Sequence, residues 1–186
     1  MLEILRRIVQ EVNAAQDLEQ ALGIIVQRVK HAMQADVCSV YLTDFTNQQY
    51  VLMASDGLNP ESVGAVRLGL TEGLIGVVAE RAEPLNLDNA PDHPRYRFVA
   101  ETGEERYHAF LGVPIIHHRK VLGVLVVRQR VQRKFDETEV TLLVTMAAQL
   151  AGAIAHAEAS GGIDGLKGER RRALRHIQGL AGAPGI

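Results

Sequence analysis

A single cysteine and seven histidines are the side chains in this sequence best suited to nucleophilic, redox or metal chemistry. Cys38 lies inside an apolar run and has no second cysteine to resolve an oxidised product, which is typical of an inert buried thiol. The histidines lack metal-ligand spacing on any one element, and the neighbours His117 and His118 would point to opposite sides of a strand. The sequence therefore predicts neither a catalytic residue nor a metal site.

Two further groups of residues resemble motifs of phosphate binding or catalysis but lack the partners that those motifs need. Gly69, Gly73 and Gly76 are spaced like a phosphate-binding loop, yet no Gly-Lys-Ser/Thr follows them. We expect these glycines to permit close approach of a helix to the sheet or to a ligand. Acidic residues are numerous between 85 and 106, but no nucleophile or base is paired with them, so general acid–base catalysis is not predicted.

Composition limits the class of protein and its partners. The 186 residues, 47% of them hydrophobic, can bury one substantial core, so one domain with appendages is expected. A net charge of -2 without a long basic run argues against nucleic-acid binding. No stretch approaches about 18 uninterrupted apolar residues, which argues against a membrane span. The lone cysteine favours a reducing compartment, and we expect a cytoplasmic protein.

Apolar periodicity predicts three long helices. They are expected at residues 2–12, at Leu18 to Met33, and after Asp136. Asp17 is the expected N-cap of the second helix, with Gln20 in the reciprocal third position, and Asp136 and Glu139 form the same start signal for the last helix. Many small residues in that last helix suit a packed bundle or a dimer interface.

Five runs rich in β-branched or otherwise apolar residues predict strands. They lie at residues 37–42, 49–54, 65–68, 107–116 and 120–130. The first two would form a hairpin, and the last is apolar on both faces, which predicts a central strand. Thr71 is the expected N-cap of a helix over 72–80. Residues 85–106 show little periodicity and predict a long irregular excursion with a turn of helix near Arg95.

This order of elements predicts an α+β domain with a mostly antiparallel central sheet. The N- and C-terminal helices would lie together on one face of the sheet. The shorter helix over 72–80 and the excursion would cover the other face. A space between this cover and the sheet is the expected place for a ligand pocket.

Four sequence segments, together with the helix-framed sheet, resemble the GAF domain family over residues 1 to about 157. They are EGLIGVVAE at 72–80, FLGVPI at 110–115, VLGVL at 121–125 and AAQLA at 147–151. Three more segments resemble the GAF domain of the nitrogen-related enzyme I family of phosphoenolpyruvate-protein phosphotransferases (PtsP). These are PLNLD at 84–88, HPRY at 93–96 and ETGEE at 101–105. Residues 179–186 look like the opening of the phosphoenolpyruvate-utilising region, which leaves 158–178 as a charged helical linker.

The resemblance implies a regulatory domain that senses a small molecule and modulates phosphoryl transfer from phosphoenolpyruvate to a carrier protein. Glutamine or 2-oxoglutarate is the kind of effector it implies. By the same resemblance, Mg and phosphoenolpyruvate act only in a catalytic region beyond Ile186, which also holds the site for the carrier protein. This segment itself is expected to carry no cofactor and to be no enzyme.

The resemblance places the ligand between the sheet and the helix that covers it. Alternation along 37–42 puts Ser39 and Tyr41 on the face opposite Val40 and Leu42, so the first pair would face a mixed polar and apolar pocket. Nine residues are expected to line it. They are Ser39, Tyr41, Ser55, Leu74, Ile75, Asn86, Asp88, Phe110 and Val113.

Two other functions remain open from the sequence. One is a dimerisation or scaffold module whose pocket is filled by side chains and whose terminal helices form a homodimer. The interface expected for it consists of Leu2, Ile8, Ala147, Ala151 and Ile154. The other is an independent enzyme of the same fold, for which Cys38 would be the nucleophile. Cysteine-dependent sulfoxide reductases and bilin-carrying sensors need reactive cysteines at other places and are disfavoured.

Overall fold

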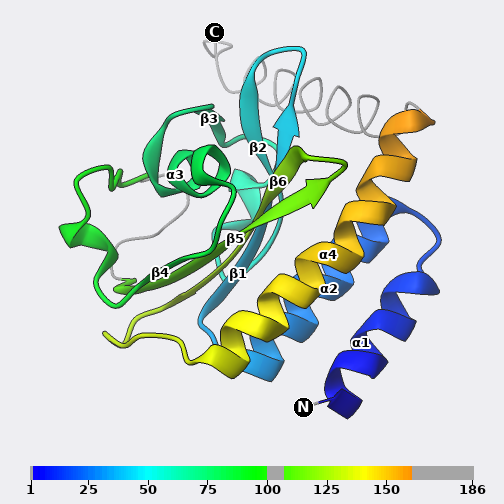
Figure 1. Cartoon of the computed structure of the whole chain (residues 1–186), viewed down its shortest axis with the longest axis horizontal. Helices are drawn as coiled ribbons and strands as arrows, with labels where there is room; N and C mark the ends of the chain where they lie inside the picture. The colour runs from blue at the N-terminus through cyan, green and yellow to red at the C-terminus, as the bar shows by residue number, and fades with distance from the viewer. Residues whose placement is uncertain (1, 100–106, 161–186) are drawn as a thin grey trace, which may run out of the picture.

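Six antiparallel strands form the central sheet of the computed structural model, which describes residues 2–99 and 107–160 (Figure 1). Their order across the sheet is β3 (Arg67–Gly69), β2 (Gln49–Asp56), β1 (Val37–Asp44), β6 (Lys120–Gln129), β5 (Ala109–His117) and β4 (Leu85–Leu87). The predicted hairpin of β1 and β2 is confirmed. The central place predicted for the strand over 120–130 is also confirmed, because β6 pairs with both β1 and β5.

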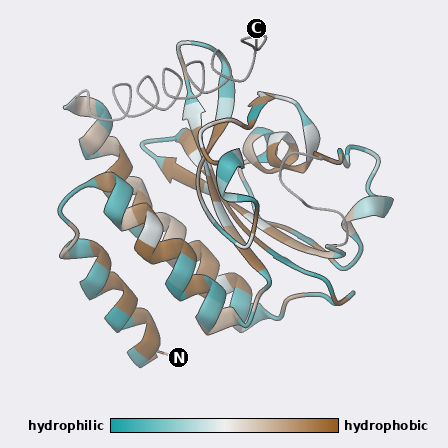
Figure 2. Cartoon of the chain, turned by 180° about the vertical axis from the view of Figure 1, so that it is seen from behind, coloured by the Kyte–Doolittle hydropathy of each residue, from teal (hydrophilic) through white to brown (hydrophobic). Residues whose placement is uncertain are grey.

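Three helices lie on one face of this sheet, as predicted from their terminal positions (Figure 1). They are α1 (Leu2–Asn13), α2 (Leu18–Met33) and α4 (Glu137–Ala159). Helices α2 and α4 pack directly on the strands, and α1 packs on these two helices as an outer layer. In Figure 2 the strands are largely brown, while α1 carries alternating brown and teal bands, as expected for an amphipathic helix.

The opposite face of the sheet is covered by α3 (Gly73–Arg81), by two short 3₁₀ helices and by the loops that join them (Figure 1). The 3₁₀ helices are η1 (Pro60–Ser62) and η2 (Ala90–Asp92). This layer has its own hydrophobic core, separate from the core on the side of the long helices. The prediction of an α+β domain with terminal helices on one face and a shorter helix on the other is confirmed.

Both predicted start signals of the long helices on the sheet are confirmed. Asp17 accepts a hydrogen bond from the backbone N of Gln20 at 2.8 Å, although the Gln20 side chain accepts from the backbone N of Gln16 rather than from that of Asp17. Asp136 and Glu139 form a complete capping box, with hydrogen bonds of 2.8 and 3.0 Å. These bonds satisfy backbone donors that the first helical turn leaves open.

The prediction that Thr71 caps α3 is wrong, because Glu72 holds that position. The Thr71 carbonyl lies outside the helix and accepts a hydrogen bond from the Arg95 guanidinium. Gly76 packs against the backbone of Thr71: a Cβ atom at Gly76 would lie 2.5 Å from the Thr71 carbonyl carbon. The glycines were expected to let the helix approach the sheet or a ligand, but the close contact of Gly76 is with the preceding loop. Close approach of α3 to the sheet depends on Gly112, where an added Cβ would lie 2.9 Å from Val78.

The described part of the excursion contains more regular structure than predicted. β4 pairs with β5, and the helical turn lies at η2 rather than near Arg95. A strand of three half-buried residues has too little alternation to be recognised in the sequence. Residues 100–106 lie outside the described residues.

Helix α4 is long and apolar enough, by composition alone, to cross a membrane. Its buried side chains include Leu143, Met146, Leu150 and Ile154, which pack in the core against the sheet. We therefore interpret α4 as a core helix of this domain. The helix continues to Ala159, two residues past the predicted domain end at 157. Most of the predicted linker, 158–178, and the whole segment 179–186 lie outside the described residues, and both stay predictions.

Candidate ligand-binding site

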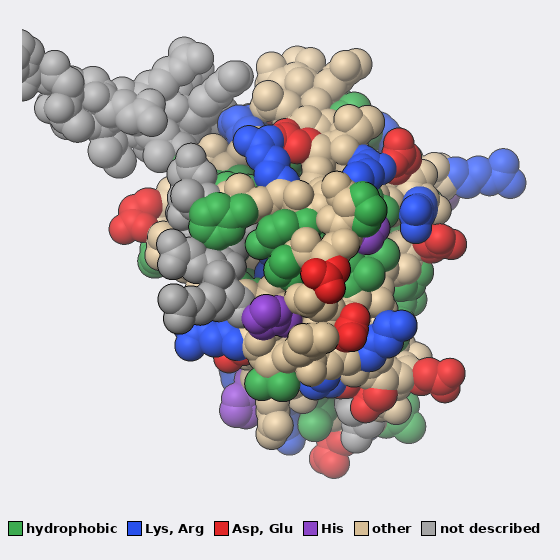
Figure 3. Space-filling model, turned by 90° about the vertical axis from the view of Figure 1, so that its left-hand side faces the viewer, with side chains coloured by type: hydrophobic (Ala, Val, Ile, Leu, Met, Phe, Trp, Pro, Cys, Tyr) green, Lys and Arg blue, Asp and Glu red, His purple; other side chains and the backbone are tan. Residues whose placement is uncertain are grey.

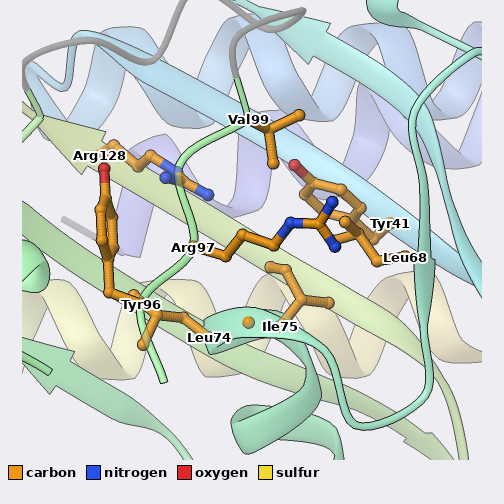
Figure 4. A pocket seen from close by; sticks show the side chains of 9 residues that line it. Tyr41, Leu68, Leu74, Ile75, Tyr96, Arg97, Val99 and Arg128 are labelled. Carbon is orange, nitrogen blue, oxygen red and sulfur yellow. The ribbon is translucent and has the colours of Figure 1, made fainter. Parts of the chain in front are cut away.

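A small cavity lies between the sheet, the start of α3 and the segment 93–99, which we call the strap (Figure 4). Its volume is about 20 Å³, which is room for about one water molecule. Nine residues line it, and most of them are aromatic or aliphatic. They are Tyr41, Leu68, Gly73, Leu74, Ile75, Tyr96, Arg97, Val99 and Arg128. Figure 3 shows this side of the molecule, where apolar side chains lie among charged groups of both signs.

The floor of the cavity is formed by side chains of the two central strands. Successive residues of a strand point to opposite faces, and directly paired residues share a face. Tyr41 of β1 pairs with Val124 of β6, and Val37 of β1 pairs with Arg128 of β6. All four residues therefore lie on the α3 side, as do Ser39 and Val126 midway between them. The alternate residues of both strands face the long helices: Cys38, Val40, Leu125 and Val127. Tyr41 is buried to 1% exposure and forms the apolar part of the floor.

Arg128 brings a positive charge to this floor. Arg128 is only 6% exposed, and its guanidinium carbon lies 5.3 Å from the centre of the Phe110 ring, in a cation–π arrangement. Because β5 and β6 pair at Phe110 and Arg128, the ring and the guanidinium group are held side by side. In Figure 4 Arg128 of the sheet lies on the same side of the view as Tyr96, whereas Arg97 of the strap extends away from it toward Tyr41.

The strap is attached to α3 by two ion pairs. Arg95 contacts Glu80 at 2.5 Å and also donates to the carbonyl oxygen of Thr71. Arg97 pairs with Oε1 of Glu72, whose other carboxylate oxygen accepts from the backbone N of Gly69 at 2.7 Å. The cover of the cavity is thus fixed at both ends of α3 by charged side chains.

The first turn of α3 forms the remaining wall. Gly73, Leu74 and Ile75 line the cavity, and the side chain of the N-cap residue Glu72 makes no capping hydrogen bond to the helix. Gly73 has a φ of 65°, in the left-handed region that favours glycine, so the chain can turn sharply into the helix at this point. The amino end of a helix carries a partial positive charge.

The comparisons with known proteins agree with this architecture. The GAF domain family matches residues 17–154. This chain belongs to the GAF domain family. It is 43% identical over its whole length to the phosphoenolpyruvate-dependent phosphotransferase system protein of Salmonella typhimurium, of which it covers 24%. The chain therefore spans about a quarter of the length of this curated relative.

Two solved GAF domains of phosphoenolpyruvate-protein phosphotransferases have the same structure. The domain from Coxiella burnetii (ptsP) is 52% identical with a TM-score of 0.83, and the match covers 86% of this chain and 95% of that one. The domain from Acinetobacter is 54% identical with a TM-score of 0.81, and the match covers 85% and 94%. The resemblance inferred from the sequence segments is confirmed.

Six of the nine pocket residues predicted from the sequence lie on the α3 side of this GAF domain. Tyr41, Leu74 and Ile75 line the cavity itself. Phe110 lies under Arg128. Ser39 and Ser55 are cross-strand partners whose hydroxyl oxygens are 3.0 Å apart, so they bind each other on the sheet away from the cavity lining.

The other three predicted residues lie elsewhere. Val113 belongs to the core under the long helices, because it is three residues from Phe110 and alternation puts the two on opposite faces. Asn86 pairs with Leu111, which also faces the long helices, and its side chain binds the backbone of Phe135. Asp88 is exposed beyond the end of β4. None of these three residues lines this cavity.

Five described lining residues besides Gly73 were missed in the sequence. They are Leu68, Tyr96, Arg97, Val99 and Arg128. Arg128 had a usable signal: it continues the alternation of Val124 and Val126 along β6 and therefore had to share their face. The strap residues had none, because their segment has no periodicity.

Cys38 is a poor nucleophile in this structure. It is fully buried, and this burial raises the pKa of its thiol well above the usual range, with the charge of Asp56 adding to the effect. At neutral pH the group is therefore a thiol rather than the reactive thiolate. Among residues 2–99 and 107–160, no three His, Cys, Asp or Glu side chains are placed to hold a metal ion.

Proposed function

We propose that this GAF domain is the regulatory, small-molecule-sensing part of a phosphoenolpyruvate-protein phosphotransferase of the nitrogen phosphotransferase system. The observation that carries the proposal is the cavity between the sheet and α3, with a buried arginine in its floor, in a domain more than half identical to two GAF domains of such phosphotransferases. Small-molecule sites are concave, mostly apolar and equipped with a few placed polar groups, and this cavity has that composition.

In this proposal, effector binding modulates phosphoryl transfer from phosphoenolpyruvate to a carrier protein. The effector is a metabolite such as glutamine or 2-oxoglutarate. Mg, phosphoenolpyruvate and the carrier protein bind to the part of the parent protein outside this chain. The parent protein acts in the cytoplasm. The segment itself is no enzyme and needs no cofactor. The buried Cys38 thiol supports this, because no other cysteine is present in the chain.

The effector changes the activity of the attached region only if it binds one conformation better than another. Helix α4 is the natural output element, because it packs on β5 and β6 and leads toward residues 161–186. Hydrogen exchange of the full-length protein with and without effector tests this step. Unchanged protection along α4 in the presence of a saturating effector would rule out the route.

Thermal denaturation of this chain against a broad metabolite panel tests the sensor proposal itself. The panel holds amino acids, 2-oxo acids, nucleotides and neutral metabolites. A ligand that binds only the folded state stabilises it by about 2.7 kcal/mol at a hundredfold excess over its dissociation constant. A saturable rise in Tm with one metabolite supports a sensor. A flat response across the whole panel favours the second candidate.

That second candidate is a dimerisation or scaffold module, favoured by the water-sized volume of the cavity. Four of the five interface residues predicted for it are buried in the monomer core and cannot serve: Ile8, Ala147, Ala151 and Ile154. Only Leu2, at 83% exposure, remains available. The exposed face of α4 instead presents Val144, Ala148 and Gly152. Analytical ultracentrifugation separates the cases, since a monomer at high concentration argues against a homodimer through the terminal helices.

A further inference from the structure

Two hairpin turns that contact each other at one end of the sheet form an exposed surface, which we call the sheet tip. It consists of residues 44–48, at the turn between β1 and β2, and residues 116–121, at the turn between β5 and β6. We propose that the sheet tip docks on an acidic surface of the region that follows this domain in the parent phosphotransferase. The inference rests on the proposed function for the existence of that region, and it adds the surface through which the two parts meet.

Large apolar side chains lie exposed on both turns. Phe45 is 42% exposed and Ile116 is 40% exposed. The ammonium nitrogen of Lys120 lies 3.8 Å from the centre of the Phe45 ring, so a cation–π contact joins the two turns. Exposed apolar groups that are held together gain free energy when a partner covers them. The sheet tip thus offers the apolar part of a docking surface.

The charge of the sheet tip is positive. Arg119 and Lys120 are exposed cations on the second turn. Asp44 is the only acidic residue of the tip, and it is 5% exposed. Its carboxylate accepts hydrogen bonds from Asn47 and Arg67. A partner therefore meets cations at the surface of the tip, while the single carboxylate is already engaged below it.

The sequence after α4 has the same sign of charge as the sheet tip. Residues 161–178 contain five lysine and arginine residues against two acidic ones. Because like charges repel, this segment is not the occupant of the tip. An acidic surface farther along the parent protein complements both, so acidic is the chemistry that the partner requires.

The backbone of the second turn is held in an unfavourable conformation. His117 pairs with Lys120, which leaves a loop of two residues, and both have positive φ: 48° for His118 and 63° for Arg119. Such loops favour asparagine and glycine, because a side chain is disfavoured in the left-handed region. Residues held in such conformations cluster at functional sites. An imidazole and a guanidinium group at these two positions therefore indicate a contact made by the side chains.

The last turn of α4 lies at the same end of the domain as the sheet tip (Figure 1). The helix begins at the opposite end, where Arg133 binds Gln129 at the end of β6. Its 23 residues span about 34 Å, and the ten residues of β6 span about 33 Å, so α4 reaches along the whole strand. A region attached after α4 is thereby kept at high local concentration beside the tip, and a modest surface suffices for docking.

Hydrogen exchange of this chain alone and of the same domain in the full-length parent protein tests the proposal. The solved GAF domains of the related phosphotransferases are separate domains, so such a domain folds without the rest of the protein. We expect the amides of the sheet tip to exchange at least about tenfold more slowly in the full-length protein, which corresponds to about 1.4 kcal/mol of docking free energy. The loop at 57–63, after the other end of β2, should exchange equally in both.

Arg119→Gly separates docking from folding. Glycine suits the positive φ at this position, so this chain alone should keep or raise its Tm. In the full-length protein the same variant should reduce the protection of the sheet tip several-fold, and the double variant Arg119→Glu, Lys120→Glu should abolish it. Arg81→Glu, at an exposed arginine of α3, is the matched control and should leave the protection unchanged.

Equal exchange of the sheet tip in the two proteins would overturn the inference, as would protection that survives the double charge reversal. Protection that increases with protein concentration would identify a second copy as the occupant and would also overturn it. The metabolite panel tests the sensor proposal separately. A flat response there leaves the docking surface in place, and an unprotected sheet tip leaves the sensor proposal in place.

Discussion

Asn86 holds the backbone of Phe135 through both ends of its carboxamide: Nδ2 donates to the Phe135 carbonyl at 2.8 Å, and Oδ1 accepts from the Phe135 N at 3.2 Å. Asn86 lies on β4, which follows α3, and Phe135 immediately precedes the N-cap of α4. The Asn86 carboxamide thus makes the same two hydrogen bonds to the Phe135 backbone that a residue of a neighbouring strand would make. The contact joins the edge of the sheet next to the cavity cover to the start of the proposed output helix.

Replacement of Asn86 by Ala should lower the free energy of unfolding by about 1 to 3 kcal/mol, because two half-buried backbone groups lose their partners. Urea denaturation followed by circular dichroism measures this change. Asp88→Ala, two residues along and exposed, is the matched control and should change stability by no more than about 0.5 kcal/mol. Equal effects of both variants would show that the Asn86 contact contributes nothing specific.

The ion pair of Arg133 and Glu139 should make stability depend on pH. Hydrogen bonds from Arg133 at 2.8 Å lower the pKa of Glu139 below its usual value. A carboxyl with a lowered pKa in the folded state stabilises it above the unfolded pKa, about 4.3, and loses that contribution as pH falls through the folded value. Glu139→Gln should therefore cost about 1 kcal/mol at pH 7.

At a pH below the folded-state pKa of Glu139, the difference between Glu139→Gln and the unaltered chain should vanish, since both side chains are then neutral. Urea denaturation at pH 7 and in acid provides the comparison. Gln keeps the oxygen that accepts from the backbone N of Asp136, so the variant removes charge and leaves the capping bond. Glu137→Gln, in the same helical turn and exposed, serves as the control. A cost that stays constant with pH would contradict the charge explanation.

Two helical glycines should respond to Ala in opposite directions. A Cβ at Gly76 would lie 2.5 Å from the carbonyl carbon of Thr71, a backbone atom that cannot move aside cheaply, so Gly76→Ala should destabilise by at least about 2 kcal/mol. A Cβ at Gly152 would meet no atom within 4 Å, so Gly152→Ala in α4 should stabilise by about 0.5 to 1 kcal/mol. Thermal unfolding of both variants checks the signs. Stabilisation by Gly76→Ala would disprove the close approach.

The sequence predicted the long helices and the central strands because their periodicity is local. It could also have assigned the faces of β5, where Phe110 and Val113 are an odd number of residues apart and cannot line the same side. The position of the strap could not be predicted from the sequence, because it depends on two ion pairs with another part of the chain. Arg95 pairs with Glu80, and Arg97 pairs with Glu72. Such long-range charge contacts leave no periodic trace. The position of the strap over the cavity could therefore be determined only from the structure.

The strap should loosen locally without loss of global stability when Arg95 is replaced by Gln. Arg95 joins the strap to Glu80 and to the Thr71 carbonyl, but its side chain and that of Glu80 are 35% and 51% exposed, and such exposed pairs contribute about 0 to 1 kcal/mol. Urea denaturation should thus show a change below about 1 kcal/mol. Hydrogen exchange should become faster at residues 93–99 while β1 and β6 keep their protection, since local opening needs less free energy than global unfolding.

Arg81→Gln, an exposed arginine at the end of α3, should leave exchange in the strap unchanged. Equal exchange rates in the strap of the Arg95 variant and the unaltered chain would mean that apolar contacts of Tyr96 and Val99, rather than the ion pair, hold the cover of the cavity in place.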